Sequence, residues 1–426
     1  MTSAAARIEL ICIGSELLSG RVNTHQSYLS LALLKEGLSI GREASLPDDQ
    51  ALVTQAICDA LKRADAVIVC GGLGPTFDDL TREAAAAALG RTMRFQPKIY
   101  ARLARKFARY RMPVPEENKR QAFVIQGARV LDNKVGSAPG QLLSLPPLKK
   151  GGRSRALVLL PGPYSELAPM FSGQVLPHLR RTYAKGLAAA SMALHMSGIP
   201  ESVADEKLKP VFAQARPGLS FTILSSPGQV DFYAFASDRS RRAARAVIAD
   251  IRKQSLAAIG DYVFGENGET LEQAVGRKLK ARGLTLAVAE SCTGGMLGQR
   301  LTSAPGSSAY FLGGAIAYSN ALKTKLLGVK PATLAKHGAV SRPCAVELAQ
   351  GARAKTGASL AVSVTGIAGP AGGTPAKPVG LVFLAISGPG KASGVWRLNL
   401  PGDRAAIRLR ATVSALHLLH RHLTRA

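Results

Sequence analysis

The segment best suited to covalent chemistry is residues 289–295, AESCTGG, which follows an apolar run and opens a helical pattern. A serine at such a turn lies near backbone amides that can hold a developing oxyanion during acyl transfer. Ser291 is therefore a candidate nucleophile. Cys292 is its rival, because a thiolate is intrinsically the better nucleophile. A serine at a Gly-rich helix start is also a common cap, so the residue types alone leave both interpretations open.

A serine nucleophile needs a base, and histidine is a poor candidate here. Of the seven histidines, only His337 falls near the loops expected around Ser291, so a Ser-His-Asp triad has little support. Lys323 can serve instead if burial or neighbouring positive charge lowers its pKa. Tyr318, in the same segment YSNALK, offers a further hydroxyl. The sequence thus allows a Ser–Lys pair.

A second cluster, CGGLGPTFDDLTRE at residues 70–83, also joins an apolar strand pattern to a helix. Its glycines let the backbone approach a ligand, and free amides at a helix N-terminus suit phosphate. The run matches neither GxGxxG nor GxxxxGK[ST], so the common nucleotide fingerprints do not apply. Asp78 and Asp79 can hold a divalent metal. Alternatively, Asp79 and Thr81 cap the next helix.

Both clusters need a strand, a loop and a helix to position them. Sequence patterns typical of strands and of helices alternate in two parts of the chain. Continuous apolar strands separated by helices indicate a parallel sheet covered on both faces. The expected strands are residues 8–14, 66–70, 156–160, 284–289, 315–318, 360–365 and 379–386, with a closing helix at 404–422. The predicted fold class is α/β: two α/β domains with mostly parallel sheets flank a small α+β module.

The predicted domains are residues 1–185, 186–264 and 265–426. The middle module is expected to contain a strand, a helix, two strands around residues 226–229 and a long Arg-rich helix. Residues 261–268, DYVFGENG, are interpreted as a polar turn at the second boundary. The module has no GxxG loop of the kind that clamps RNA, so a spacer or oligomer contact is favoured.

Composition narrows the class of protein. The 426 residues are 46% hydrophobic, which excludes a wholly disordered or fibrous chain. No apolar run reaches the roughly 18 residues of a membrane span, and five cysteines without a CxxC pair argue against a disulfide scaffold. A cytoplasmic protein without a membrane partner is expected. The net charge of +27 is spread along the chain, which favours a solvated surface over a nucleic-acid groove.

Several separated motifs in the first half carry a resemblance. They are GSELLSG at 14–20, PDD at 47–49, GGLGPTFDDLTREA at 71–84, PEENKRQA at 115–122, SAPG at 137–140 and LPGP at 160–163. In order and spacing they resemble the molybdopterin-binding-like domain of the CinA family. That resemblance implies a metal-dependent ADP-ribose pyrophosphatase. The chain departs from the family at His25, which replaces a usual amide and can weaken substrate contact or activity.

The resemblance also implies site residues in this half. The implied metal ligands are Asp48, Asp79 and Glu16, with the identity of the divalent cation left open. Phosphate and substrate contacts are implied for Gly71, Gly72, Gly74, Pro75 and Asn118. A binder of pterin phosphate without hydrolysis remains the alternative for this domain.

The second half resembles the nicotinamide-mononucleotide (NMN) deamidase domain of the same family over residues 268–424. The motifs are ESCTGG at 290–295, PGSSAYFLGGAIAYSNALK at 305–323, KHGAVS at 336–341, SVTGIAGP at 363–370, KPVG at 377–380 and PGDR at 401–404. The implied reaction hydrolyses NMN to nicotinate mononucleotide and ammonia without a cofactor. The implied roles are nucleophile for Ser291, general base for Lys323 and supporting hydroxyl for Tyr318.

The other motif residues of this half receive binding roles. Amides of Thr293, Gly294 and Gly295 are expected around the oxyanion. The loop with Thr365, Gly366 and Gly369 suits a ribose or phosphate, or is simply a tight turn. Arg404 can pair with the 5′-phosphate, or is a solvated surface residue.

Partners follow from these resemblances. The middle segment resembles the KH-like module that lies between such domains. NMN, ADP-ribose and a second copy in a homodimer are the expected partners. A DNA-recombination or competence accessory protein remains the binding-class alternative.

Overall fold

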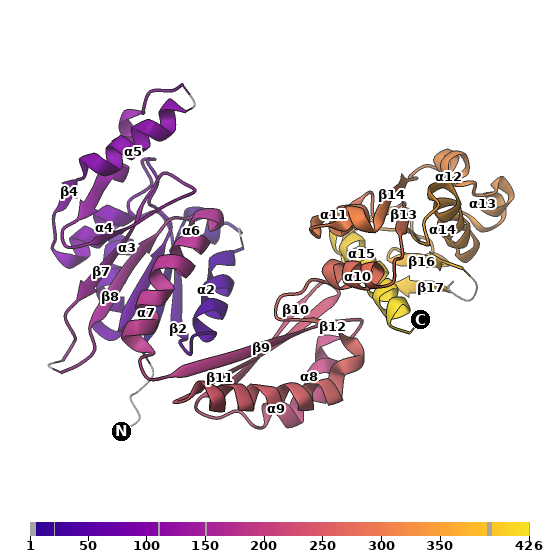
Figure 1. The fold of residues 1–426 in the computed structure, drawn as a ribbon. Coiled ribbons are helices and arrows are strands. Elements are labelled where there is room, and N and C mark those ends of the chain that lie inside the picture. Colours follow the sequence, from indigo (N-terminus) through magenta and orange to yellow (C-terminus); the bar gives the residue numbers. More distant parts are fainter. Residues whose placement is uncertain (1–5, 21, 110, 150, 390–393, 426) are drawn as a thin grey trace. The chain divides into compact units, whose positions relative to one another are not determined.

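The computed structural model describes residues 6–20, 22–109, 111–149, 151–389 and 394–425 (Figure 1). The chain divides into two compact units. One contains residues up to Ser191 and the segment Phe235–Val247, and the other contains Met192–Ala234 and residues from Ile248 onward. Within the described ranges, no helix combines the length and the apolar character needed to cross a membrane.

The first sheet has the strand order β2-β1-β3-β8-β7-β6. Its strands are β1 (Ile8–Ile13), β2 (Ile40–Leu46), β3 (Ala66–Cys70), β6 (Arg129–Leu131), β7 (Gly140–Leu145) and β8 (Arg155–Leu160). The strands β2, β1, β3 and β8 are parallel, and β7 runs antiparallel to β8 and β6. The three strands predicted in this half are confirmed as β1, β3 and β8.

Helices cover both faces of this sheet, which explains its continuous apolar strands. One face packs against α2 (Thr24–Leu34), α6 (Tyr164–Met170) and α7 (Leu176–Tyr183), and the other against α3 (Gln50–Arg63) and α4 (Thr81–Leu89). Alternate residues of each strand enter the two cores: Leu10 and Cys12 face α2, whereas Ile11 and Ile13 face α3. The remaining elements up to α7 are α1 (Ser15–Leu18), β4 (Met93–Phe95), α5 (Pro97–Ala108), η1 (Glu116–Ala122), β5 (Phe123–Ile125) and η2 (Phe171–Val175). The elements β1 to α7 are called the N-terminal domain below.

The middle sheet has the order β10-β11-β9-β12. The elements are β9 (Ala188–Ser197), α8 (Glu201–Phe212), β10 (Leu219–Ser226), β11 (Gln229–Asp238), α9 (Arg241–Ile259), η3 (Gly260–Tyr262) and β12 (Val263–Glu266). The predicted order of a strand, a helix, a hairpin and a long helix is confirmed. The polar turn predicted over residues 261–268 is wrong, because β12 pairs antiparallel with β9 and buries Phe264.

The third sheet has the order β14-β13-β15-β16-β17. The strands are β13 (Leu286–Glu290), β14 (Phe311–Ile316), β15 (Leu360–Gly366), β16 (Leu381–Ser387) and β17 (Gly394–Asn399). The central strands β14, β13 and β15 are parallel, and β16 and β17 continue the sheet in antiparallel fashion. The four strands predicted in this half correspond to β13, β14, β15 and β16.

The helices of this third layer are α10 (Leu271–Ala281), α11 (Met296–Ser303), α12 (Asn320–Leu327), α13 (Pro331–His337), α14 (Arg342–Thr356) and α15 (Arg404–Arg425), with the short turn η4 (Ser307–Ala309). One core joins α10, α11 and α15 to the sheet, and a second joins α14 to it. The elements α10 to α15 are called the C-terminal domain below. Helix α15 also contacts the middle sheet: Ser197 of β9 shares a 2.7 Å hydrogen bond with Nδ1 of His417.

Candidate active sites

Ser291 lies directly after β13, where three parallel strands end together. Its backbone N–H donates to the carbonyl of Val364 in β15 at 2.9 Å. From β14, the other neighbour of β13, the N–H of the following residue Ala317 donates to the Glu290 carbonyl at 2.8 Å. Only 8% of Ser291 is exposed. The carboxyl ends of parallel strands are where α/β sheets carry their ligand sites. The predicted nucleophile is therefore held rigidly at such an edge.

The turn after Ser291 is closed by Glu290, which the sequence analysis did not single out. Its carboxylate is 2% exposed and accepts three backbone N–H groups, from Gly295 at 3.0 Å, Leu297 at 3.0 Å and Gly298 at 2.8 Å. A carboxylate at a helix N-terminus satisfies amides that have no partner within the helix. Glu290 thus fixes the start of α11. An acidic residue immediately before a Gly-rich helix start was the available signal.

The amides predicted to surround an oxyanion are only partly available. The Gly294 N–H donates to the Ser291 carbonyl at 3.1 Å, and the Gly295 N–H is the donor to Glu290. Both glycines have positive φ, 59° and 97°, so their role in this structure is to shape the turn. Among the described residues, the Thr293 amide is the member of the predicted trio without such a bond.

A guanidinium also holds this turn from the side of α15. Arg408 Nη2 donates to the Thr293 carbonyl at 2.8 Å. Arg408 was not predicted, although it follows Arg404 by four residues and therefore lies on the same helix face. The hydroxyl of Thr293 is buried and has no hydrogen-bond partner among the described residues.

Lys323, the residue predicted as the base, is buried. It is 1% exposed on α12, a helix that begins after the Ser319 cap, and its Nζ donates to the Tyr318 carbonyl at 2.8 Å. Burial lowers the pKa of Lys323, because the charged ammonium loses its hydration. A lysine with a lowered pKa is more readily neutral and can accept a proton.

The neighbouring thiol is the weaker nucleophile. Cys292 is buried, and burial raises its pKa to about 11. At neutral pH it is therefore protonated, whereas the thiolate is the reactive form. This favours Ser291 over Cys292.

Three motifs that lie far apart in the sequence meet around Arg404. Its Nη2 donates to the Tyr318 hydroxyl at 3.0 Å, and its Nη1 donates to the Gly369 carbonyl at 2.8 Å. The side chain of Tyr318 remains exposed. Arg404 is thus an anchored guanidinium beside the lysine segment, which fits the predicted contact with an anionic group better than a free surface residue does.

Two residues of the predicted ribose or phosphate loop are packed away. Thr365 is buried, and its hydroxyl donates to the Ala339 carbonyl at 2.9 Å. A Cβ on Gly366 would lie 2.7 Å from Cγ2 of Val382. The tight-turn interpretation therefore fits these two positions, and Gly369 is the member of the loop that contacts Arg404.

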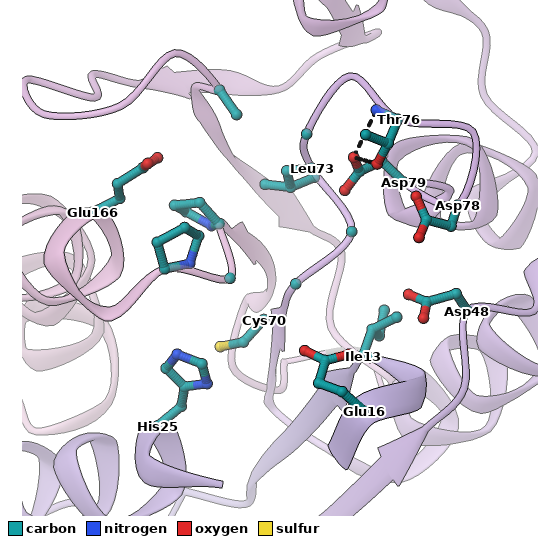
Figure 2. Close-up of a pocket in the computed structure, with 18 of the residues that line it drawn as sticks. Ile13, Glu16, His25, Asp48, Cys70, Leu73, Thr76, Asp78, Asp79 and Glu166 are labelled. Atoms are coloured by element: carbon teal, nitrogen blue, oxygen red, sulfur yellow. Dashed lines mark hydrogen bonds between the residues drawn. The ribbon is translucent and has the colours of Figure 1, made fainter. Parts of the chain in front are cut away.

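The N-terminal domain contains a cavity of about 530 Å³ at the carboxyl ends of β1, β3 and β8 (Figure 2). It is lined by all of the metal and phosphate-loop residues predicted for this half: Glu16, Asp48, Gly71, Gly72, Gly74, Pro75 and Asp79. His25 lines it too. Asn118 does not; it is buried and its side-chain amide donates to Gln121, which does line the cavity.

The loop after β3 depends on glycine where it passes β1. Gly71 has φ 105°, and a Cβ there would lie 2.2 Å from the Ile13 carbonyl oxygen. The hydroxyl of Thr81 donates to the Gly71 carbonyl at 2.8 Å. The close approach of the two backbones leaves no room for a side chain.

The carboxylates of the cavity are held by hydroxyl and amide groups. Asp48 accepts the N–H and the hydroxyl of Ser15, both at 2.8 Å. Asp79 accepts the N–H and the hydroxyl of Thr76, as the dashed lines in Figure 2 show. The alternative in which Asp79 and Thr81 cap α4 is wrong, since Asp79 bonds back to Thr76 and Thr81 to Gly71.

Asp78 differs from these carboxylates. Its Oδ1 is buried without a hydrogen-bond partner among the described residues, and the residue lines the same cavity as Asp48 (Figure 2). In the described part of the chain, no group of three or more His, Cys, Asp or Glu side chains is arranged to hold a metal ion. A cation bound by one or two of these carboxylates would need further oxygens from a phosphate ligand, as Mg²⁺ often does.

Family models match three segments of the chain. They are the CinA C-terminal domain at residues 268–423, a probable molybdopterin binding domain at 9–181, and the KH domain of damage-inducible protein CinA at 191–265. A Moorella thermoacetica protein with a competence-damage inducible name is 42% identical over 416 residues, 97% of this chain and 98% of its own.

A second relative also has a CinA name. A CinA-like protein of Koribacter versatilis is 40% identical over 97% of this chain and 99% of its own. Among solved structures, competence/damage inducible protein CihA from Agrobacterium tumefaciens is 41% identical, covering 35% of this chain and 92% of its own with a TM-score of 0.35.

Proposed function

Because this chain belongs to the CinA family, we propose that its C-terminal domain hydrolyses the amide of NMN to give nicotinate mononucleotide and ammonia. The observation that carries the proposal is Lys323: a buried lysine with a lowered pKa, on the segment that adjoins the Ser291 turn. A base of this kind is what a serine nucleophile without histidine requires.

The proposed reaction proceeds through an acyl-enzyme. Neutral Lys323 takes the hydroxyl proton as Ser291 Oγ attacks the amide carbon, and the Thr293 amide donates to the developing oxyanion. The intermediate collapses when the amide nitrogen receives the proton from Lys323 and leaves as ammonia. Water, deprotonated by the same lysine, then releases the acid. Acyl transfer by this pair requires no cofactor.

Arg404 and Tyr318 are proposed to bind the nucleotide rather than to act in proton transfer. Arg404 already donates to Tyr318 and Gly369, so its position is fixed before the ligand binds. A guanidinium in a fixed orientation suits a phosphate, to which it can donate twice. Tyr318, whose side chain is exposed, is proposed to contact the nucleotide beside Arg404.

The test is ammonia release from NMN by the full chain. Ser291→Ala and Lys323→Met should each lower kcat by at least about 10³-fold, because nucleophile and base act as a unit. Cys292→Ala is the matched control and should keep kcat within about twofold. Loss of activity in Cys292→Ala with retention in Ser291→Ala would reverse the assignment of the nucleophile. No ammonia from folded wild-type protein would contradict the proposed substrate.

A second activity is proposed for the N-terminal cavity: hydrolysis of the pyrophosphate of ADP-ribose. The supporting observation is a glycine loop and the carboxylates of Asp48, Asp78 and Glu16 around one cavity. One or two of these carboxylates, together with phosphate oxygens of the ligand, would hold a hard divalent cation, and the unpartnered Asp78 Oδ1 offers it an anionic oxygen. Such a cation would neutralise phosphate charge, while the amides of the loop orient the pyrophosphate.

Turnover of ADP-ribose with added Mg²⁺ or Mn²⁺ tests this activity. Asp78→Asn and Asp79→Asn should lower it by about 10²-fold or more, while Asp59→Asn on the exposed face of α3 should not. Binding of ADP-ribose without turnover would favour the non-hydrolytic phosphate binder.

DNA binding tests the remaining alternative, a DNA-recombination or competence accessory protein. An affinity for DNA that falls steeply with salt and does not depend on base sequence would show only the electrostatics of a +27 chain.

A further inference from the structure

Two cysteines face each other on neighbouring strands at the floor of the N-terminal cavity. β1 and β3 pair in parallel with Cys12 opposite Cys70. Both side chains enter the same apolar core, so they point to the same face of the sheet. Paired strands lie about 4.8 Å apart, and disulfides join Cα atoms separated by about 4.4 to 6.8 Å. The two thiols are therefore placed for a bond without a change of strand pairing.

We propose that Cys12 and Cys70 are a redox-active dithiol that closes to a disulfide beneath the phosphate loop of the N-terminal domain. Both cysteines are free in this structure. The proposed bond would join β1 and β3 near their carboxyl ends, just before the loops that begin at Gly14 and Gly71. It does not depend on which ligand the cavity binds.

The cavity gives an oxidant access to one of the two sulfurs. Cys70 lines the cavity together with Gly71 and His25. Figure 2 shows the Cys70 side chain directed at the cavity. Both cysteines are buried, Cys12 with 0% and Cys70 with 1% of the residue exposed, but only Cys70 of the two lines the cavity. A small oxidant such as a peroxide that enters the cavity therefore meets Cys70 first.

The two thiols also interact with each other before any oxidation. A hydrogen bond from the Cys70 thiol lowers the pKa of Cys12, because it stabilises the Cys12 thiolate. The same bond and burial raise the pKa of Cys70. This asymmetry assigns Cys12 as the sulfur that closes the disulfide, since thiolates attack.

The other cysteines of the chain lack such a partner arrangement. Burial raises the pKa of Cys292 and of Cys344 to about 11, which keeps both as unreactive thiols at neutral pH. Cys58 lies on α3 and its Sγ is 3.6 Å from the Ala88 carbonyl oxygen. It serves as the reference thiol below.

The chemistry balances with a peroxide as oxidant. The Cys12 thiolate accepts the Cys70 thiol proton as the Cys70 sulfur attacks one peroxide oxygen, so an S–O bond forms as the O–O bond breaks. The released hydroxide takes that proton from Cys12 and leaves as water. The Cys12 sulfur then attacks the Cys70 sulfur, the S–S bond forms, the S–O bond breaks, and a second water leaves with the proton that the Cys12 thiol released on ionisation. Two thiols are oxidised and one peroxide is reduced.

Hydrogen peroxide on the folded full-length chain tests the proposal, with thiols counted after denaturation. The wild type should lose two of its five thiols and about two mass units, and dithiothreitol should restore both. Peptide mapping should recover one cross-linked pair containing Cys12 and Cys70. Cys58→Ser should still lose two thiols.

Cys12→Ser should abolish the loss of two mass units, and Cys70 should then gain oxygen instead of a cross-link. Peptide mapping of the wild type keeps the test independent of whether that variant folds. Retention of all five thiols under conditions that oxidise glutathione would overturn the proposal. So would a cross-link between other cysteines, or between chains.

Discussion

In the N-terminal domain, the loops after β1 and β3 enclose a cavity of about 530 Å³. In the C-terminal domain, Ser291 on the turn after β13 and Lys323 on α12 are both buried. Both sites lie at the carboxyl ends of central parallel strands. The same edge of an α/β sheet is thus used in two ways: one site presents backbone and carboxylates to a ligand, and the other presents a few side chains in fixed positions.

The loops after β3 and β13 differ in one of the features that fix them. Charged side chains hold both: Arg82 donates to the Gly74 carbonyl in the N-terminal loop, and Glu290 and Arg408 bond to the backbone of the C-terminal turn. Only the N-terminal loop begins with a close approach of two backbones, since a Cβ on Gly71 would lie 2.2 Å from the Ile13 carbonyl oxygen. Such an approach fits a site that presents backbone to a phosphate, whereas a carboxylate that binds three amides beside Ser291 fits a site where one hydroxyl must be aimed. Variants at Gly71 and at Glu290 test these two features separately.

The largest effect is expected from Gly71→Ala. The added Cβ meets the Ile13 carbonyl oxygen at 2.2 Å, and φ 105° is strained for alanine. The displaced loop should lower the affinity for ADP-ribose or its rate of turnover at least about 100-fold. Isothermal titration and turnover assays measure it, with NMN deamidation as an internal reference that should stay unchanged.

Gly41→Ala is the matched control for that variant, because its Cβ meets the nearest atom at an ordinary 3.9 Å. Equal losses in the two variants would mean that general destabilisation, and not the phosphate loop, is responsible. The role assigned to the Gly71 loop in the N-terminal site would then be wrong.

A smaller effect is expected from Glu290→Gln. The amide keeps the size of the side chain but loses the charge and part of the acceptor capacity for the N–H groups of Gly295, Leu297 and Gly298. The turn should loosen, so kcat for NMN should fall about 10- to 100-fold with KM changed less than about threefold. Steady-state kinetics separate the two parameters.

Glu272→Gln is the control, because Glu272 is also a buried carboxylate of the C-terminal domain, paired with Arg300 at 2.6 Å. It should lower stability without lowering kcat. A fall in kcat of the same size in both variants would show that Glu290 contributes only to folding.

The smallest effect is expected on stability at acid pH. Burial lowers the pKa of His417 and of His420 to about 4 from 6.5. Between these values the unfolded chain binds more protons, so the free energy of unfolding should decrease as pH falls from 6.5 toward 4. At about pH 5.5 the loss should be roughly 1 to 1.5 kcal/mol for each histidine. Urea unfolding at pH 7.5 and 5.5 measures it.

His417→Gln should remove about half of that pH dependence, and His337→Gln, at an exposed position, should remove none. The unfolding transition of the C-terminal domain should shift more than that of the N-terminal domain, where burial also lowers the pKa of a histidine, His178. A matching shift in the N-terminal transition would mean that the two domains do not differ in acid sensitivity.

The sequence predicted the parts of the fold that depend on local pattern. Strands buried on both faces, such as β3 and β13, are continuous apolar runs, and the loops that follow them contain the motif residues. Strand β2 was not predicted, because it lies at a sheet edge and its sequence IGREASL is largely polar. Strand β12 was taken for a turn, because its pairing with β9 joins residues far apart in the chain.

The same limit applies to the site residues. Ser291 and Lys323 could be predicted because their residue types carry chemistry. Glu290 and Arg408 act through bonds to backbone atoms, and their signals in the sequence, an acidic residue before a Gly-rich helix start and a four-residue spacing from Arg404, do not by themselves indicate such bonds. Thr365 was expected to face a ligand, and the structure buries it, since a strand-end threonine gives no indication of its direction.

Helix α15 has fixed spacing between two sets of contacts. Arg408 holds the Ser291 turn, and nine residues further on His417 bonds to Ser197 of the middle sheet. Each residue advances an α-helix by about 1.5 Å and turns it by roughly 100°. Insertion or deletion of one residue between these positions would rotate one set of contacts away from its partners. The number of residues in this stretch is therefore constrained more strictly than their identity.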